Sequence, residues 1–185
     1  MNKMKKIKVY TVFSEDGFVP REGLLWTIDQ MKIRKNDYGF LDFLETVDCT
    51  ILNKSYYNLI RKHNIRWKLM VPYYVVTNQV FLADNPHDVR FILDRPDRYN
   101  YWDIQVKELQ FPGFGDIWLI GDYDLIRNFA KMDMLDEATF VTFPTKIEDG
   151  LKYSMSEFTM DQWKITEKKT YEDGVVRINY KKIVL

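Results

Sequence analysis

The stretch from Gly115 to Glu137 is the feature that most constrains what this chain can fold into. An apolar run, Ile117 to Ile120, is followed by Gly121, then by an amphipathic pattern, and a second apolar run begins at Ala138. This order predicts a strand, a tight turn, a helix and another strand. In such a unit the helix begins just beyond the end of the first strand, where nucleotide-binding folds place phosphates.

Length and composition predict one globular domain over residues 1–185 and exclude several classes of function. A chain of 185 residues that is 46% hydrophobic can bury a continuous core and is not disordered as a whole. The 27 basic and 27 acidic residues balance, so the net basic charge of a nucleic-acid-binding protein is missing. No apolar run approaches the roughly 20 residues that span a bilayer. We therefore expect a cytoplasmic protein without a membrane or nucleic-acid partner.

Histidine and cysteine are too sparse to build a metal site. The histidines are His63 and His87, and the single cysteine is Cys49. A metal cluster of the usual ligand types has no support in this pattern. Cys49 is followed by the apolar pair Ile51 and Leu52, which predicts a buried, reduced thiol rather than a nucleophile.

Apolar residues recur at strand or helix spacing along much of the remaining chain. Strands are predicted at residues 6–13, 49–52, 71–77, 89–93 and 140–143, and helices at residues 37–47, 56–63 and 101–110. Asn36 or Asp37 is available to cap the first of these helices, and Ser55 to cap the second. Residues 21–36 show only a weak pattern, in which Trp26 covers a pocket or packs beneath a loop.

The C-terminal region predicts a β-hairpin. Asp173-Gly174 separates two β-rich runs, Trp163–Tyr171 and Val175–Ile183, and a tight turn there requires a residue at positive φ. Alternating strands and helices that finish with an antiparallel hairpin favour an α/β architecture of three layers around a mainly parallel, mixed sheet flanked by helices.

Four segments in order carry a resemblance to a known family: Ser14–Val19, Asp48–Tyr56, Ile117–Ile126 and Thr170–Tyr180. Over almost its whole length the chain resembles the dihydrofolate-reductase-like family. The closest likeness is to the reductase domain of bifunctional riboflavin-biosynthesis proteins and its stand-alone bacterial relatives. The resemblance implies a homodimeric, NADPH-dependent reductase that transfers a hydride to a pterin-like or pyrimidine-type small molecule.

The resemblance also implies where the cofactor and the substrate bind. Lys54 would pair with the 2′-phosphate of NADPH, and Ser55 would offer a hydroxyl and an amide to a phosphate. Alternatively, Lys54 is a solvated charge and Ser55 only a helix cap. The implied cofactor-binding residues are Lys54, Ser55, Thr77, Asn78, Gly121, Asp122 and Tyr123. The implied substrate-pocket residues are Ser14, Asp16, Gly17 and Trp26.

Two residues depart from the family pattern at the expected phosphate positions. Asn53 replaces a glycine, and Asp122 replaces the second glycine of the turn after Gly121. Asp122 adds a negative charge that would repel a phosphate, although aspartate is also a good N-cap. The alternative to a reductase is therefore a non-catalytic member of the fold that binds a ligand or has a structural role. Asp42 and Glu45 are expected to face solvent, so no catalytic residue is assigned.

Overall fold

The protein is known from a computed structural model, which describes residues 5–20, 23–63, 65, 73–77, 89–93, 115–152 and 162–183. The strands are β1 (Ile7–Ser14), β2 (Phe18–Val19), β3 (Val47–Asn53), β4 (Tyr73–Thr77), β5 (Val89–Leu93), β6 (Asp116–Ile120), β7 (Glu137–Phe143), β8 (Leu151–Lys152), β9 (Trp163–Thr170) and β10 (Val176–Lys182). The helices are α1 (Gly23–Arg34), α2 (Phe40–Glu45), α3 (Lys54–Lys62) and α5 (Tyr123–Lys131).

The main sheet has eight strands in the order β5-β4-β3-β6-β1-β7-β10-β9. Neighbouring strands from β5 through β7 pair in parallel, whereas β10 pairs antiparallel with both β7 and β9. The strand that ends at Ile120 and the strand that begins at Glu137 lie on opposite sides of β1. The helix between them, α5, therefore crosses over the central strand. This topology confirms the predicted mainly parallel, mixed sheet with a C-terminal hairpin.

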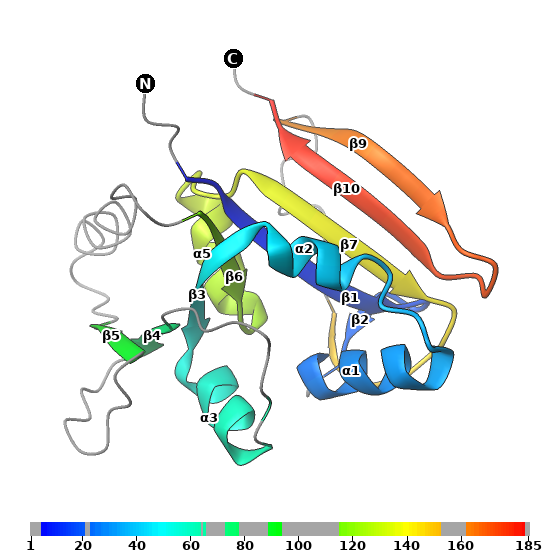
Figure 1. Cartoon of the computed structure of the whole chain (residues 1–185), viewed down its shortest axis with the longest axis horizontal. Helices are drawn as coiled ribbons and strands as arrows, with labels where there is room; N and C mark the ends of the chain where they lie inside the picture. The colour runs from blue at the N-terminus through cyan, green and yellow to red at the C-terminus, as the bar shows by residue number, and fades with distance from the viewer. Residues whose placement is uncertain are drawn as a thin grey trace.

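Helices cover both faces of the sheet, as Figure 1 shows, with α1, α2 and α3 in front of it and α5 behind it. The front layer packs Leu24, Phe40 and Tyr57 against one buried cluster, and the back layer packs Leu125 and Phe129 against the other. The helices α3 and α5 turn an apolar stripe toward the sheet, as amphipathic helices do. The three-layer arrangement is the predicted one.

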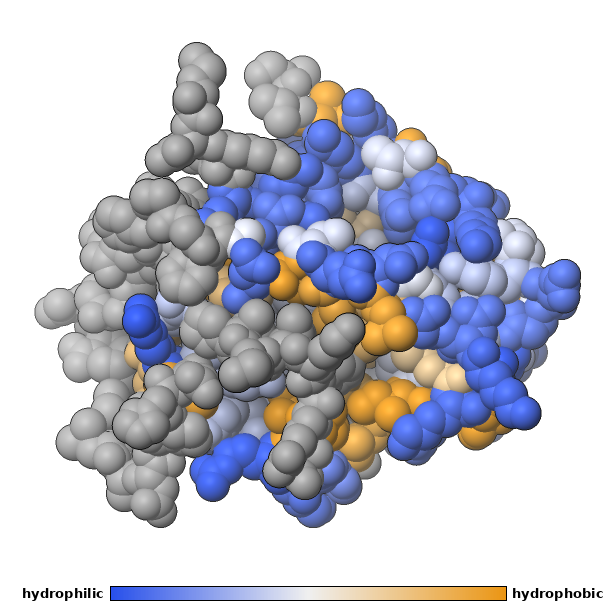
Figure 2. Space-filling model, viewed as in Figure 1, coloured by the Kyte–Doolittle hydropathy of each residue, from blue (hydrophilic) through white to orange (hydrophobic). Residues whose placement is uncertain are grey.

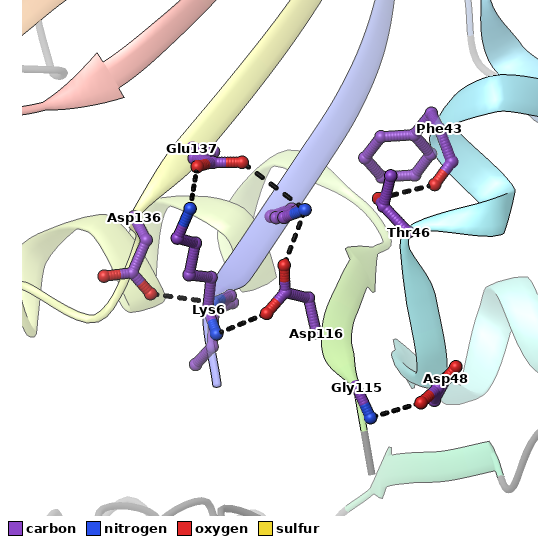
Figure 3. A network of polar contacts seen from close by, with 10 residues as sticks. Lys6, Phe43, Thr46, Asp48, Gly115, Asp116, Asp136 and Glu137 are labelled. Carbon is purple, nitrogen blue, oxygen red and sulfur yellow. Dashed lines mark hydrogen bonds and ion pairs between the residues drawn. The ribbon is translucent and has the colours of Figure 1, made fainter. Parts of the chain in front are cut away.

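Charged side chains tie the amino-terminal end of β1 to both of its neighbours (Figure 3). The Lys8 ammonium lies 2.6 Å from a carboxylate oxygen of Asp116 and 3.4 Å from one of Glu137. The Lys6 ammonium pairs with Glu137, and the Lys6 amide donates to Asp116 over 3.1 Å. Because these groups come from β1, β6 and β7, they help to fix the register of the three strands.

The C-terminal hairpin forms as its sequence predicts. Gly174 has φ +83°, and its amide donates to the carbonyl of Tyr171 over 3.0 Å. A side chain at this φ is strained, so glycine is the favoured residue. Between the hairpin and the front helices, the Tyr38 hydroxyl donates to the carboxylate of Asp173.

Two segments of the front face differ from the sequence prediction. Residues 23–34, where the pattern is weak, form α1. The helix predicted over residues 37–47 is only α2, because Val47 is already the first residue of β3 and is buried there. The N-cap of α2 is Gly39 at φ +83°, although the Asp37 carboxylate still accepts the Leu41 amide over 2.8 Å.

The Cys49 thiol is buried, as the sequence predicts, and burial raises its pKa to about 12. The predicted helix at residues 101–110 lies outside the described residues. No helix within the described ranges is long and apolar enough to cross a membrane.

Candidate functional site

A slot opens between the sheet and α1, at the carboxyl ends of β1 and β6. Its volume is about 70 Å³, several times the roughly 10–15 Å³ that one water requires. Figure 2 shows hydrophobic surface near the centre of the face that carries α1, α2 and α3. The residues that line the slot are Tyr10, Thr11, Val12, Val19, Pro20, Gly23, Leu24, Thr27, Phe40, Tyr56, Trp118, Ile120, Gly121, Asp122, Ile126 and Leu151.

One wall of the slot is α1, which the sequence pattern did not predict. Gly23, Leu24 and Thr27 line the slot from this helix. A Cβ on Gly23 would lie 3.4 Å from the Tyr56 hydroxyl, which is an ordinary van der Waals distance. The Thr27 hydroxyl donates to the Gly23 carbonyl over 2.6 Å. The weak apolar pattern of residues 21–36 gave no indication that Gly23 and Thr27 line this wall.

A second wall is a small two-stranded sheet in which β2 pairs antiparallel with β8. Val19 and Leu151 line the slot from these strands. The Ser14 hydroxyl accepts the Phe18 amide over 3.0 Å, and its oxygen lies 3.1 Å from the Phe18 carbonyl oxygen. The hydrogen bond from the Phe18 amide fixes the turn that leads into β2.

Asp16 attaches this wall to the segment that precedes β8. Its carboxylate accepts the amides of Glu148 over 3.0 Å and Ile147 over 3.4 Å. A hydrogen bond from Ser14 and these amides lower the pKa of the Asp16 carboxyl. Of the residues expected in a substrate pocket, Ser14 and Asp16 thus hold the wall, and Gly17 supplies the turn at φ +82°.

Trp26 packs away from the slot. Its ring lies edge-on to Phe143, with centroids 5.2 Å apart. It is not among the described residues that line the slot, whereas its helix neighbours Leu24 and Thr27 are. Of the two roles left open for Trp26, packing is the one that the structure supports.

Two helices begin at neighbouring strands of the sheet, beside the slot. α3 follows β3 and α5 follows β6, and these strands are neighbours in the sheet. Asn53 caps α3, because its side-chain oxygen accepts the Tyr56 amide over 3.2 Å. Asp122 caps α5, because its carboxylate accepts the Leu125 amide over 3.1 Å. The cap of α3 is therefore Asn53 rather than Ser55.

The two caps are also bonded to each other. The side-chain amide of Asn53 donates to the second carboxylate oxygen of Asp122. The two residues that depart from the family pattern thus form one unit, which spans the carboxyl ends of β3 and β6. No local sequence signal indicates this pairing, because 69 positions separate the partners.

The slot carries little charge. Among its described lining residues, Asp122 is the only one with a formal charge at neutral pH. Burial, followed by the nearby charge of Asp122, raises the pKa of Tyr56 to about 12. Tyr56 therefore keeps its proton at neutral pH and presents a neutral hydroxyl group. Its role in the slot was not predicted from the sequence.

The predicted phosphate-binding residues of α3 and β4 lie beside the slot rather than in it. The Lys54 ammonium lies 4.9 Å from the ring centroid of Tyr57 and 5.2 Å from that of Phe91, in cation–π geometry. Ser55 is exposed in the first turn of α3, and Thr77 is buried at the end of β4. Asn78 lies outside the described residues.

Gly121 connects β6 to α5 and lines the slot. A Cβ at this position would lie 2.7 Å from Cδ2 of Leu125, so a larger residue would displace that side chain. Tyr123 is the first residue of α5. Gly121 and Asp122 are thus the predicted cofactor residues that the structure brings to the slot.

The two helix ends differ in how well they suit the phosphates of a nicotinamide dinucleotide. Near the start of α3, the Lys54 ammonium and the exposed Ser55 hydroxyl are donors that fit an anion. At α5, the Asp122 carboxylate already accepts the Leu125 amide and adds a negative charge. This turn therefore does not fit a pyrophosphate in the way that a pair of glycines would.

Comparison with curated protein sequences finds two relatives from Bacillus subtilis (strain 168), YwjB and YyaP, each described as an uncharacterized protein. YwjB is 27% identical over 152 residues, which cover 80% of this chain and 81% of YwjB. YyaP is 26% identical and covers 96% of this chain and 95% of its own length. No family model matches the sequence.

Solved structures confirm the dihydrofolate-reductase-like fold that the resemblance implies. A protein from Shewanella sp. PV-4, described as a riboflavin biosynthesis protein, superimposes with a TM-score of 0.70 at 19% identity and covers 97% of this chain and 99% of its own. A pyrimidine reductase-like protein from Corynebacterium diphtheriae gives 0.64 at 13% identity, with 100% and 94% covered. The bifunctional diaminohydroxyphosphoribosylaminopyrimidine deaminase/5-amino-6-(5-phosphoribosylamino)uracil reductase from Thermotoga maritima gives 0.63 at 10% identity, and the match spans 97% of this chain but 57% of that protein.

Proposed function

We propose that this chain is a NAD(P)H-dependent reductase that transfers a hydride to a pyrimidine- or pterin-like ring. The observation that carries the proposal is the slot, which is mainly apolar and lies at the carboxyl ends of β1 and β6. Aromatic and aliphatic walls with a few polar groups are typical of sites for flat organic ligands. The fold is shared with chains described as pyrimidine reductase-like, which favours this class of ligand.

The position of the slot in the sheet supports the same proposal. The connection that follows β1 runs across β6 to reach β3. The connection that follows β6 runs in the opposite direction, across β1, to reach β7. Strands whose connections run in opposite directions leave a crevice beyond their carboxyl ends, where open α/β sheets bind ligands.

The residues of the chain contribute binding and orientation to this reaction. When bound, the nicotinamide cofactor supplies the hydride. Leu24 and Trp118 exclude water from the substrate ring, and the protonated Tyr56 hydroxyl orients its polar edge. Lys54 and Ser55 hold an anionic group of the cofactor near the start of α3. No residue is assigned as the proton donor.

A turnover assay tests this function. Oxidation of NADPH is followed against a panel of pyrimidines and pterins, with the wild-type chain and two tryptophan variants. Leu24→Trp fills the slot and is expected to abolish turnover. Leu41→Trp is the matched control, because Leu41 is 58% exposed on α2 and lies outside the slot, so its turnover should equal the wild type. Absence of turnover with every substrate, or full turnover in Leu24→Trp, would refute the proposal.

A second candidate function is a binding protein of the same fold without reductase activity. The pairing of Asn53 with Asp122 favours it, because these residues close the turn where a pyrophosphate would lie. Turnover with NADPH in the assay above excludes this candidate. Tight binding of a ring compound with no NADPH binding in either the wild type or Asp122→Asn supports it.

We also propose that the chain forms a homodimer through its C-terminal hairpin. β9 is an edge strand of the sheet, and Ile165 on it is 57% exposed. An exposed edge strand is a ready surface for pairing with another chain. Light scattering during size exclusion measures the mass: a dimer that Ile165→Lys converts to a monomer supports the proposal, and a monomeric wild type contradicts it.

A further inference from the structure

The charges around the slot limit what it can bind. Among the described lining residues there is no lysine, arginine or histidine, and the one formal charge is the carboxylate of Asp122. Proteins hold phosphate groups with arginine, lysine and helix amides. Here the first-turn amide of Leu125 is already taken by Asp122 itself. A phosphate in this slot would meet a like charge and no cation among the described lining residues.

The same carboxylate can accept hydrogen bonds from a ligand. One of its oxygens accepts the Leu125 amide and the other accepts the side-chain amide of Asn53. A carboxylate offers about four lone-pair positions, so each oxygen can accept one bond more. The half-buried Asp122 also lines the slot. A ring whose edge carries N–H groups satisfies the remaining positions, and a charged acceptor makes such bonds strong.

Asn53 holds the Asp122 carboxylate in this orientation. It fixes Asp122 at one oxygen while its own side-chain oxygen caps α3. The carboxylate therefore cannot turn away from the slot to admit an anion without losing this bond and the cap of α5. The negative charge of Asp122 is thus a fixed part of the slot lining.

We infer that the slot selects a neutral or cationic nitrogen heterocycle that presents N–H donors to Asp122, and that it rejects the phosphorylated nucleotide of the same base. This inference names the substrate class of the proposed reductase and rests on the slot being its substrate site. It distinguishes this chain from a reductase that acts on a phosphoribosyl compound, because that substrate carries a phosphate. The class of ligand is an aminopyrimidine or related base, free or as its riboside.

A matched series of ligands tests the inference without any cofactor. Cytosine, cytidine and cytidine 5′-monophosphate are titrated calorimetrically into the full-length wild-type protein at low and moderate salt. Cytosine and cytidine are expected to bind. The monophosphate is expected to bind weaker than cytidine by on the order of tenfold, with a smaller gap at higher salt, because a like charge within several ångströms is repulsive and is screened by ions.

Two variants assign the discrimination to Asp122. Asp122→Asn keeps a capping side chain but removes the charge, so it should remove most of the penalty on the monophosphate and weaken cytosine binding several-fold. Asp124→Asn is the matched control, because Asp124 lies exposed in the first turn of the same helix and outside the slot. It should leave all three affinities within about twofold of the wild type, as its charge is solvated.

The other possible results of these titrations each uphold or overturn the inference. Tighter binding of the monophosphate than of cytidine, or no binding of any of the three ligands, would overturn the inference. An equal effect of Asp122→Asn and Asp124→Asn would also overturn it. Because no NADPH is present, cytosine binding that depends on Asp122 would uphold the inference even if no reductase activity were found. Turnover of a phosphorylated substrate would uphold the reductase and refute the inference.

Discussion

The bond between Asn53 and Asp122 makes a quantitative prediction about stability. Each residue caps a helix, and the two are bonded to each other, so a double-mutant cycle separates the mutual bond from the two caps. The variants are Asn53→Ala, Asp122→Ala and the combination. If the residues act as one unit, the double variant loses less stability than the sum of the single variants.

The expected magnitudes follow from the contacts. Losing an N-cap costs about 1 kcal/mol. A hydrogen bond to a charged group is worth about 1.5–3 kcal/mol when buried, and this partly buried bond should contribute near or below the lower figure. Each single variant should therefore lose about 2 kcal/mol of unfolding free energy, and the coupling energy should be about 1 kcal/mol.

Urea unfolding followed by circular dichroism measures these free energies. Ser55→Ala is the matched control, because Ser55 is exposed in the first turn of α3 but is not its cap, and it should change stability by less than about 0.5 kcal/mol. A coupling energy near zero would refute the pairing. A Ser55→Ala loss as large as that of Asn53→Ala would refute the assignment of the cap.

Three further predictions follow from the site and its surroundings. Gly121→Ala places a Cβ 2.7 Å from Leu125 Cδ2 and should cost about 1–3 kcal/mol in urea unfolding; an unchanged midpoint would contradict the close approach. Asp16→Asn should lower the thermal midpoint at neutral pH, because the wild-type carboxylate holds the Glu148 amide. Because the folded pKa of the Asp16 carboxyl is lowered from 3.8, the wild type should be more stable than Asp16→Asn above that pH. The stability difference should vanish as the pH falls through the lowered pKa, and a difference that persists in stronger acid would contradict this reasoning. The Cys49 thiol, with a pKa raised to about 12, should react with an alkylating reagent at mildly alkaline pH only after unfolding, and fast reaction of the folded chain would contradict its burial.

The sequence predicted those elements whose local pattern matches their environment. The run Ile117–Ile120, Gly121 and the apolar stripe of Leu125 and Phe129 all form as expected, because strand burial and helix periodicity agree there. The hairpin is equally local, since Gly174 at positive φ fixes its turn. The fold could therefore be predicted from pattern and resemblance together.

Tertiary contacts decided what the sequence pattern missed. The residues of α1 have no strong amphipathic stripe, and the helix is held by contacts such as that between Trp26 and Phe143. Val47 continues the helical spacing of α2 but is buried in β3 instead. In both places, packing against the sheet outweighed the local signal.

The candidate site was predictable only in part for the same reason. Gly121 and Asp122 were expected at a ligand site and do line the slot, whereas Tyr56 and the residues of α1 were not expected there. Considered alone, Asn53 and Asp122 are each unfavourable at a phosphate site, because they replace glycines and Asp122 adds a negative charge. Their hydrogen bond shows that they act together, and nothing in either local segment indicates a partner so far along the chain.

Calorimetric titration of NADPH into the wild-type protein and into Asp122→Asn tests the reductase proposal most directly. The proposal predicts saturable binding of one NADPH per chain to the wild type. It also predicts that Asp122→Asn leaves this affinity within about twofold of the wild type, because the proposed anion site is Lys54 and Ser55 at the start of α3, whereas Asp122 lines the substrate slot. No binding of NADPH to either protein at millimolar concentration would contradict the proposed function.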